Sequence, residues 1–468
     1  MLRYLIWLFC FVYKSHGENL EMNNANPLKK FLQFLLPSMM TMIMLAVYTF
    51  ADTFVVGQRL GSVALGAMGV CTPVLTVTYA FGFLFGMGGA SHYALLKGSG
   101  DQNTAGEFFT TSVMLLLLCG TAAAILLNIF AEPFALFLGA TRENMTYVMP
   151  YLRVLLCYIP GFMMDVLMMS FMKNEGHPTI AMIATITGSG LNVILDFVFV
   201  FAFDWGMFGA AFATALCSGI GLMINICCAL FGHMNIRLKK IKMRSDVIRK
   251  ILSNGFSILI LEASSGIVTF VFIHQAALLY GRTGSSIYTI IMNWSLIFVN
   301  LTIGIAQAMQ PLVSYSCGAG DTANMKRYMR YALISATVLG LIDSMVCLIF
   351  AGPLSGVFTS DSREVINMAA EALRMYQPAF LFMAPGICIG YYFQAAAKAG
   401  YASITMLSRG IVLPVLFVLV LPLVFGKTGL WISVPLTELF TSGIAVFLLL
   451  HSYTERKTQN AVDYREKS

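Results

Sequence analysis

The chain has 468 residues, of which 58% are hydrophobic and only 11% are charged, with a net charge of +7 and a mean hydropathy of +0.79. Soluble domains carry about 25% charged residues, so this composition excludes a protein with a fully wetted surface. Apolar stretches of roughly 20 residues recur along the chain, which is enough to cross a hydrocarbon core of about 30 Å as helices. The predicted fold class is therefore an all-α membrane protein.

The first residues form a tail that precedes the first spanning segment. Residues 5–12 are apolar, but no small-residue cleavage site typical of a signal peptide follows them. Met22 opens a polar stretch that looks like an ordinary cytoplasmic start. We expect an N-terminal tail at residues 1–26, and the sequence is compatible with a start at Met1 or at Met22.

Twelve apolar segments follow, separated by polar breaks. The expected helices begin near Phe31, Val63, Phe108, Met145, Pro178, Met207, Ile251, Ser285, Tyr328, Val365, Ala402 and Thr428. They form a first six-helix bundle at residues 27–234 and a second at 251–452. A basic linker at residues 235–250 joins the bundles, and a cytoplasmic tail at 453–468 ends the chain.

The two halves repeat at an offset of about 220 residues. Gly98-Ser-Gly-Asp101 matches Gly318-Ala-Gly-Asp321, and the run 206–209 matches 426–429. Because each half holds six helices, both halves enter the membrane from the same side. The sequence thus predicts parallel repeats, related by a pseudo-twofold axis along the membrane normal, with a central cavity between the bundles.

Positive charge is concentrated in the linker, around the single acid Asp246. The cationic residues there are Arg237, Lys239, Lys240, Lys242, Arg244, Arg249 and Lys250. Nucleic-acid binding is one interpretation, but a basic segment beside membrane helices normally sets topology and contacts anionic lipid. We therefore expect a monomer in the cell inner membrane with both termini cytoplasmic, with lipid partners and no nucleic-acid partner.

An energy source or catalytic centre is not evident in the sequence. The fragment Gly426-Lys427-Thr428 lacks the upstream glycine of a phosphate-binding loop, because position 421 is leucine, and it lies between two apolar helices. The histidines occur singly, without the spacing of a metal site. The chain is predicted not to be an enzyme and to have no cofactor.

Acidic residues inside apolar segments are the strongest functional signal, because a buried carboxylate is costly unless it is paired, hydrated or protonated. They are Asp52, Asp165, Asp196, Glu262, Asp343 and Glu438. With a helical rise of about 1.5 Å per residue, Asp52, Asp196 and Thr214 fall in the outer half of the first bundle. Asn192 lies one turn below Asp196 on the same helix face.

These four side chains offer oxygen ligands for Na⁺, or a pair of carboxylates that shares one proton. The alternative is an interfacial position where water solvates both acids. In the second bundle, Glu262 lies near the midplane, and Gln307 and Gln310 add polar groups on helix eight, so a second ion or substrate contact in the cavity is a further hypothesis. Asp165 and Asp343 suit helix–helix hydrogen bonding or a lipid interface equally well.

Four segments between residues 27 and 450 resemble signatures of the multidrug and toxic compound extrusion (MATE) family. They are Ala51-Asp-Thr-Phe-Val-Val-Gly57, Gly176-His-Pro178, Leu191-Asn-Val-Ile-Leu-Asp196 and Gly209-Ala-Ala-Phe-Ala-Thr214. In the DinF-like branch, an Asp in helix one, an Asn-x-x-x-Asp pair in helix five and a Thr in helix six form the cation site. These correspond here to Asp52, Asn192, Asp196 and Thr214.

The NorM-like branch instead relies on a Glu in helix seven and an Asp in helix ten; here Glu262 falls about a turn early, and helix ten has no matching Asp. The resemblance implies a cation-coupled antiporter, with H⁺ favoured over Na⁺, that exports small organic, often cationic or aromatic, compounds by alternating access. The alternative is a lipid-linked precursor flippase of the same superfamily. A membrane enzyme or receptor finds no support in the motifs.

Overall fold

The structure is a computed structural model that describes residues 26–231, 234, 236–239, 244–358 and 363–467. The predictions for residues 1–25 lie outside the described residues. All regular elements in the described part of the chain are helical, which confirms the predicted all-α class.

The helices of the first half are α2 (Pro27–Gly98), α3 (Gln102–Ile129), α4 (Ala131–Phe137), α5 (Met145–Cys157), α6 (Ile159–Glu175), α7 (Pro178–Asp196), the π-helix η1 (Phe197–Ala202) and α8 (Gly206–Phe231). Those of the second half are α9 (Ser245–Tyr280), α10 (Arg282–Gly318), α11 (Thr322–Phe358), α12 (Arg363–Tyr376), α13 (Ala379–Ala395), α14 (Ala399–Leu407), the π-helix η2 (Ser408–Val412), α15 (Leu413–Phe425) and α16 (Lys427–Lys467).

Twelve spans, six in each half, arise from these helices. Within the described residues, ten helices are long and apolar enough to cross a membrane. Two of them belong to α2, because Gly61, with φ of 81°, interrupts its helical backbone. The bent pair α5 and α6 forms an eleventh span, with an angle of 52° between the helices. The pair α12 and α13 takes the equivalent place in the second half, and α13 is a shorter apolar helix.

The internal repeat appears as two equivalent turns at one end of the molecule. Gly100 and Gly320 adopt positive φ values of 87° and 71°. Asp101 then accepts a hydrogen bond from the Thr104 amide at 3.0 Å, as Asp321 does from the Asn324 amide at 2.9 Å. The bonds from Thr104 hold the pKa of the Asp101 carboxyl below its ordinary value, so this cap stays charged near neutral pH.

The helices that lead into these turns cross each other closely. A methyl group on Gly98 would overlap the Tyr315 carbonyl, and one on Gly318 would overlap the Leu95 carbonyl. The reciprocal contact at the 220-residue offset, at the same end of both halves, is the arrangement expected of parallel repeats. We call this end, which also carries the linker, the linker side.

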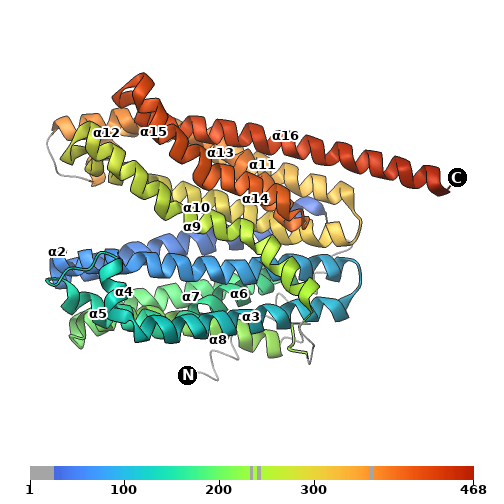
Figure 1. The fold of residues 1–468 in the computed structure, drawn as a ribbon, viewed down its shortest axis with the longest axis horizontal. Helices are drawn as coiled ribbons and strands as arrows, with labels where there is room; N and C mark the ends of the chain where they lie inside the picture. The colour runs from blue at the N-terminus through green and yellow to red at the C-terminus, as the bar shows by residue number, and fades with distance from the viewer. Residues whose placement is uncertain (1–25, 232–233, 235, 240–243, 359–362, 468) are drawn as a thin grey trace.

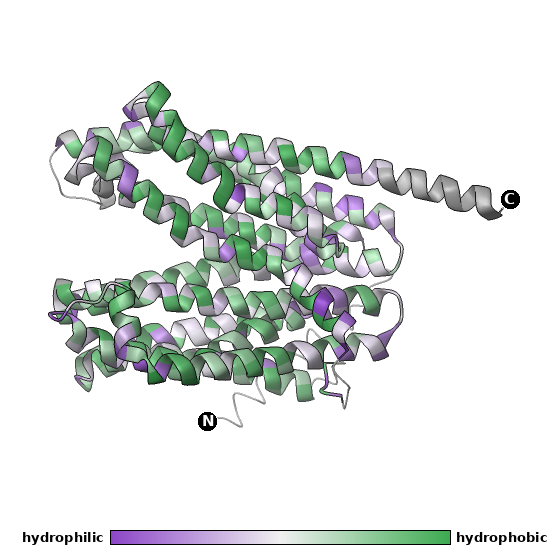
Figure 2. Ribbon diagram, in the orientation of Figure 1, coloured by the Kyte–Doolittle hydropathy of each residue, from purple (hydrophilic) through white to green (hydrophobic). Residues whose placement is uncertain are grey.

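The two halves form separate bundles, each around its own apolar core. In Figure 1 the bundle of α2–α8 and the bundle of α9–α16 meet at the linker side and diverge toward the other end. Apolar residues also cover much of the helices' outer surface (Figure 2), as lipid-facing helices require. The first turns of α2 pack against the second bundle, because Phe31 and Phe34 belong to the apolar core of that bundle.

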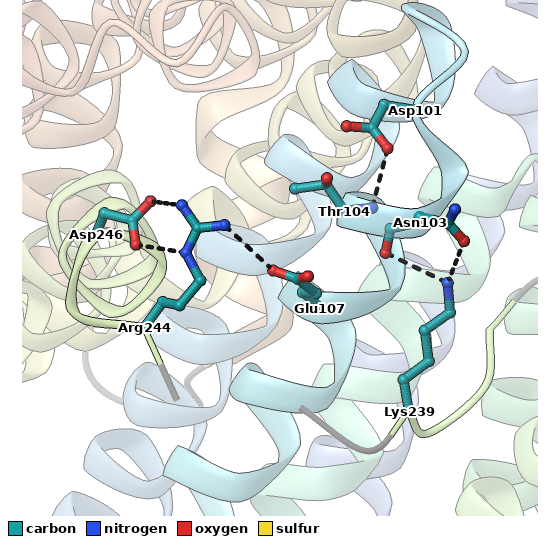
Figure 3. Close-up of polar contacts among 7 residues, drawn as sticks. All are labelled: Asp101, Asn103, Thr104, Glu107, Lys239, Arg244 and Asp246. Atoms are coloured by element: carbon teal, nitrogen blue, oxygen red, sulfur yellow. Dashed lines mark hydrogen bonds and ion pairs between the residues drawn. The ribbon is translucent and has the colours of Figure 1, made fainter. Parts of the chain in front are cut away.

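The linker is bound to the first bundle by its basic side chains (Figure 3). Lys239 Nζ donates to the Asn103 side-chain oxygen at 3.2 Å, at the start of α3. Arg244 makes two hydrogen bonds to Asp246, at 3.1 and 2.9 Å, and lies 3.9 Å from Glu107. Part of the predicted basic cluster therefore contacts protein, and the start of α9 is attached to α3.

Candidate transport site

Buried hydrogen bonds join the two bundles on the linker side. Lys173 Nζ on α6 donates to Gln307 Oε1 on α10 at 2.8 Å. Asn174 Nδ2, on the next residue of α6, donates to Gln310 Oε1 at 3.1 Å, about one turn farther along α10. Ser91 Oγ accepts from Gln310 at 2.8 Å and from Gln394 on α13 at 2.6 Å. Because a broken bond here would leave a polar group without water, these contacts hold the bundles together at this end.

A cavity of about 340 Å³ lies beyond these contacts, between the bundles. Its walls come from α2, α6, α7 and α8 of the first bundle and from α9 and α10 of the second. Gln307 lines the cavity as well as binding Lys173, so the interbundle contacts lie at its floor. The volume lies within the range of small-molecule sites.

The cavity wall carries two acidic residues. Asp165 lines it from the first bundle and Glu262 from the second, and the described lining residues include no lysine or arginine. Tyr48 and Tyr79 add aromatic surface. Carboxylates and aromatic faces both attract organic cations, so the chemistry of the wall favours positively charged molecules.

Asp52 and Asp196 lie within electrostatic reach of each other, one turn beyond lining residues of the cavity. They are 4% and 0% exposed. Neither oxygen of Asp196, nor Oδ1 of Asp52, finds a hydrogen-bond partner among the described residues. Two buried carboxylates of like charge cannot both stay ionised without a counter-ion, so this pair is suited to binding a proton or a metal cation.

Asn192 and Thr214 connect this pair to the cavity. Both line it, and Asn192 Nδ2 donates to Thr214 Oγ1 at 3.4 Å, while Asn192 Oδ1 has no partner in the described part of the chain. Helices α7 and α8 pack side by side, and α7 carries Asn192 and Asp196 on one face because they are four residues apart. The four predicted coupling residues thus gather in one bundle, on the cavity's border.

The other predicted polar residues lie in different places, and not all of them line the cavity. Glu262 and Gln307 line the cavity, whereas Gln310 lies below it in the interbundle contacts. Asp343 accepts a hydrogen bond from Trp294 Nε1 at 3.0 Å, away from the cavity. Among the described residues, no group of three metal-ligating His, Cys, Asp or Glu side chains forms.

Sequence reasoning did not select two of the polar features that the structure shows. Asp165 was visible as an acid in an apolar segment, but its position on the cavity wall depends on how α6 is rotated. The Arg409–Glu438 ion pair, at 2.8 Å, joins η2 to α16. Its signal was an arginine within an apolar segment, a residue that requires a buried partner.

Comparison with known proteins identifies the family. The MatE family model matches residues 37–198 and 255–420, one segment in each bundle. The chain belongs to the MatE family. This makes it a membrane transporter and not an enzyme, and the predicted family resemblance is confirmed.

Similar proteins cover nearly the whole MatE chain. The multidrug export protein MepA of Staphylococcus haemolyticus is 25% identical over 90% of this chain and 93% of its own. An outward-facing multidrug resistance MATE transporter of the MOP superfamily superposes with a TM-score of 0.88, at 22% identity over 94% of this chain and 99% of that one. A MOP superfamily transporter from Pyrococcus furiosus gives 0.86, at 23% identity over 92% and 97%. These structures share the fold.

Proposed function

We propose that this chain is a monomeric, proton-coupled antiporter that exports small organic cations, with Asp52, Asn192, Asp196 and Thr214 as its coupling site. One observation carries the proposal: two buried carboxylates lie beside a cavity with acidic lining residues, and neither oxygen of Asp196 nor Oδ1 of Asp52 has a hydrogen-bond partner in the described chain. The match of these four residues to the DinF-like pattern supports the same assignment.

We propose that the chain lies in the cell inner membrane. In the proposed orientation, the linker side faces the cytoplasm. The basic linker and most basic residues near helix ends lie on that side, in accord with the positive-inside rule. The bundles are in contact there, so the cavity in this conformation faces outward. Both termini are then cytoplasmic, and the remaining basic linker residues contact anionic lipids.

Protons act through the charge of the coupling pair. A proton that enters from outside neutralises the repulsion between Asp52 and Asp196, which changes how α2 and α7 pack. An ion shifts a conformational equilibrium only by its differential affinity for the two states. In the proposed cycle, protonation favours release of the exported cation outward, and loss of the proton to the cytoplasm favours reloading.

The acidic residues of the cavity also favour one of the two candidate substrates over the other. An organic cation gains attraction from Asp165 and Glu262, whereas a lipid-linked precursor with a diphosphate would meet like charge on both walls. The name of the staphylococcal relatives, multidrug export proteins, supports the same choice. These observations on the described residues favour export of an organic cation over flipping of a lipid-linked precursor.

Transport by the purified chain in proteoliposomes tests the proposal. With ethidium as cargo, an imposed pH gradient in sodium-free buffer should drive accumulation against its concentration gradient. Accumulation driven only by a Na⁺ gradient would overturn proton coupling and assign the same site to sodium. Scrambling of a fluorescent lipid-linked diphosphate, with no ethidium transport, would overturn the export function.

A further inference from the structure

Asp165 differs from the coupling acids in its surroundings. It lies on α6, on the cavity wall, and its Oδ2 accepts a hydrogen bond from Ser218 Oγ on α8 at 3.1 Å. Its Oδ1 faces the small residue Gly221, at 3.6 Å from where a side chain would begin there. The Asp165 carboxylate is thus held in position and reaches the cavity. Asp196, at the border of the cavity, is fully buried.

Glu262 presents a second carboxylate to the same cavity from the opposite bundle. It is on α9, and α10 contributes Leu296, Asn300, Ile303 and Gln307 to the same cavity wall. Asp165 and Glu262 are the two acidic residues among the described lining residues, and most of the other lining residues are apolar or aromatic. The cavity therefore has one carboxyl group on each bundle.

We propose that Asp165 is a specificity-determining residue that, together with Glu262, binds the two positive ends of a dicationic substrate, one end on each bundle. This rests on the proposed export of organic cations and names the substrate class of that cavity. A molecule with two cationic ends joined by an apolar chain matches a largely apolar cavity to which each bundle contributes one carboxyl group. Binding of the first end makes binding of the second effectively intramolecular, which raises affinity without new contacts.

The position of the two acids on different bundles also links substrate binding to the transport cycle. When the bundles move relative to each other, the distance between Asp165 and Glu262 changes, whereas a contact within one bundle keeps its geometry. A dication of fixed length therefore has different affinity for the two conformations, which is the condition for a ligand to shift the equilibrium between them. A monocation needs only one of the carboxylates.

Binding of matched probes to the full-length protein in detergent tests this assignment. The probes are polymethylene bis(trimethylammonium) salts with five to twelve methylenes, and alkyltrimethylammonium salts of equal chain length. In the unmodified protein, bis-cation affinity should peak at one chain length. Asp165→Asn and Glu262→Gln should each weaken the best bis-cation about tenfold, and both together about 100-fold, while each weakens the monocation less than about threefold.

A matched control removes a negative charge outside the cavity. Asp204, which pairs with Arg59 at 3.3 Å on the surface, is replaced in Asp204→Asn, and both probes should bind as before. Equal weakening of mono- and bis-cations by Asp165→Asn, or no weakening of either, would overturn the proposal. The proposal would also be overturned if the bis-cation affinity of Asp165→Asn peaked at the same chain length as that of the unmodified protein.

The outcome is separable from that of the proposed function. Asp204→Asn, outside the cavity, should retain pH-driven ethidium transport. In Asp165→Asn, ethidium binding should still depend on pH, because the coupling pair is intact. If that pH dependence is lost in Asp165→Asn, Asp165 belongs to the coupling machinery and the dication assignment is wrong. Failure of the unmodified protein to transport ethidium under a pH gradient would instead reject the proton-coupled export on which the assignment depends.

Discussion

The two bundles have the same fold but surround their buried acids differently. In the second bundle, Glu438 accepts a hydrogen bond from Arg409 Nε at 3.1 Å and forms an ion pair with its Nη2 at 2.8 Å, and Asp343 accepts a hydrogen bond from Trp294. In the first bundle, Asp196 has no such partner among the described residues, and the nearest charge is the like charge of Asp52. An acid neutralised within the fold supports the fold, while an acid without a counter-ion is available to a mobile cation.

The difference extends to equivalent positions in the repeat. At the 220-residue offset, Glu438 corresponds to Ser218, which lines the cavity and binds Asp165. The equivalent position on the sixth span of each half therefore forms an ion pair in the second bundle, through Glu438, and lines the cavity in the first bundle, through Ser218. The comparison predicts that Glu438, which has a counter-ion, matters for stability, and that Asp52 and Asp196, which have none among the described residues, matter for transport.

The largest effect is expected on stability, from Glu438→Gln. This change leaves Arg409 buried without its counter-ion, which costs about 3–5 kcal/mol of folding free energy. Thermal unfolding of the purified protein in detergent should show a marked fall in the midpoint. Replacement of both residues by leucine should recover most of the loss, and Asp52→Asn should cause none. An unchanged midpoint in Glu438→Gln would contradict the assignment.

The next effect concerns coupling, through Asp196→Asn. The amide resembles the protonated acid in size but cannot cycle its charge, so pH-driven ethidium export should fall about 100-fold. By linkage, a site that binds protons and affects substrate affinity makes that affinity depend on pH, and the variant should lose this dependence. Asp343→Asn in the second bundle is the matched control. Normal pH-driven export by Asp196→Asn would move the coupling site, with Glu262 the next candidate.

An intermediate effect is expected where the bundles are alike. Gly98→Ala and Gly318→Ala each force a methyl group against a backbone carbonyl of the other bundle, at a cost of about 1–3 kcal/mol to closure of the linker side. With Ser314→Cys in a cysteine-free background, modification by a maleimide added from the linker side should be faster in both variants. A much larger effect of one glycine than the other would contradict their equivalence.

The smallest effect is expected from Arg244→Ala in the linker. Its partners Asp246 and Glu107 are partly exposed, and exposed ion pairs add little to stability because water and salt screen them. The thermal midpoint and transport rate should stay within error of the unmodified protein. A large loss of either would show that the attachment of α9 to α3 is needed for the motion of the bundles.

The sequence by itself determined the class and the order of the spans. The expected starts at Val63, Met145 and Pro178 coincide with helix or span starts in the structure, and the others fall within six residues. This follows because the apolar length that crosses a bilayer is a local property of the chain. The cost of an acid in such a segment is also local, so Asp52 and Asp196 could be selected without a fold.

Only the tertiary structure decided which polar groups meet. It brings Asp165 and Glu262 to one cavity, pairs Arg409 with Glu438, and places Gln310 in the interbundle contacts below the cavity. These outcomes depend on how each helix is rotated about its axis and on which helix from a distant part of the chain faces it. In a segment that is apolar on all sides, the hydrophobic pattern does not specify that rotation, so packing against neighbouring helices decides it.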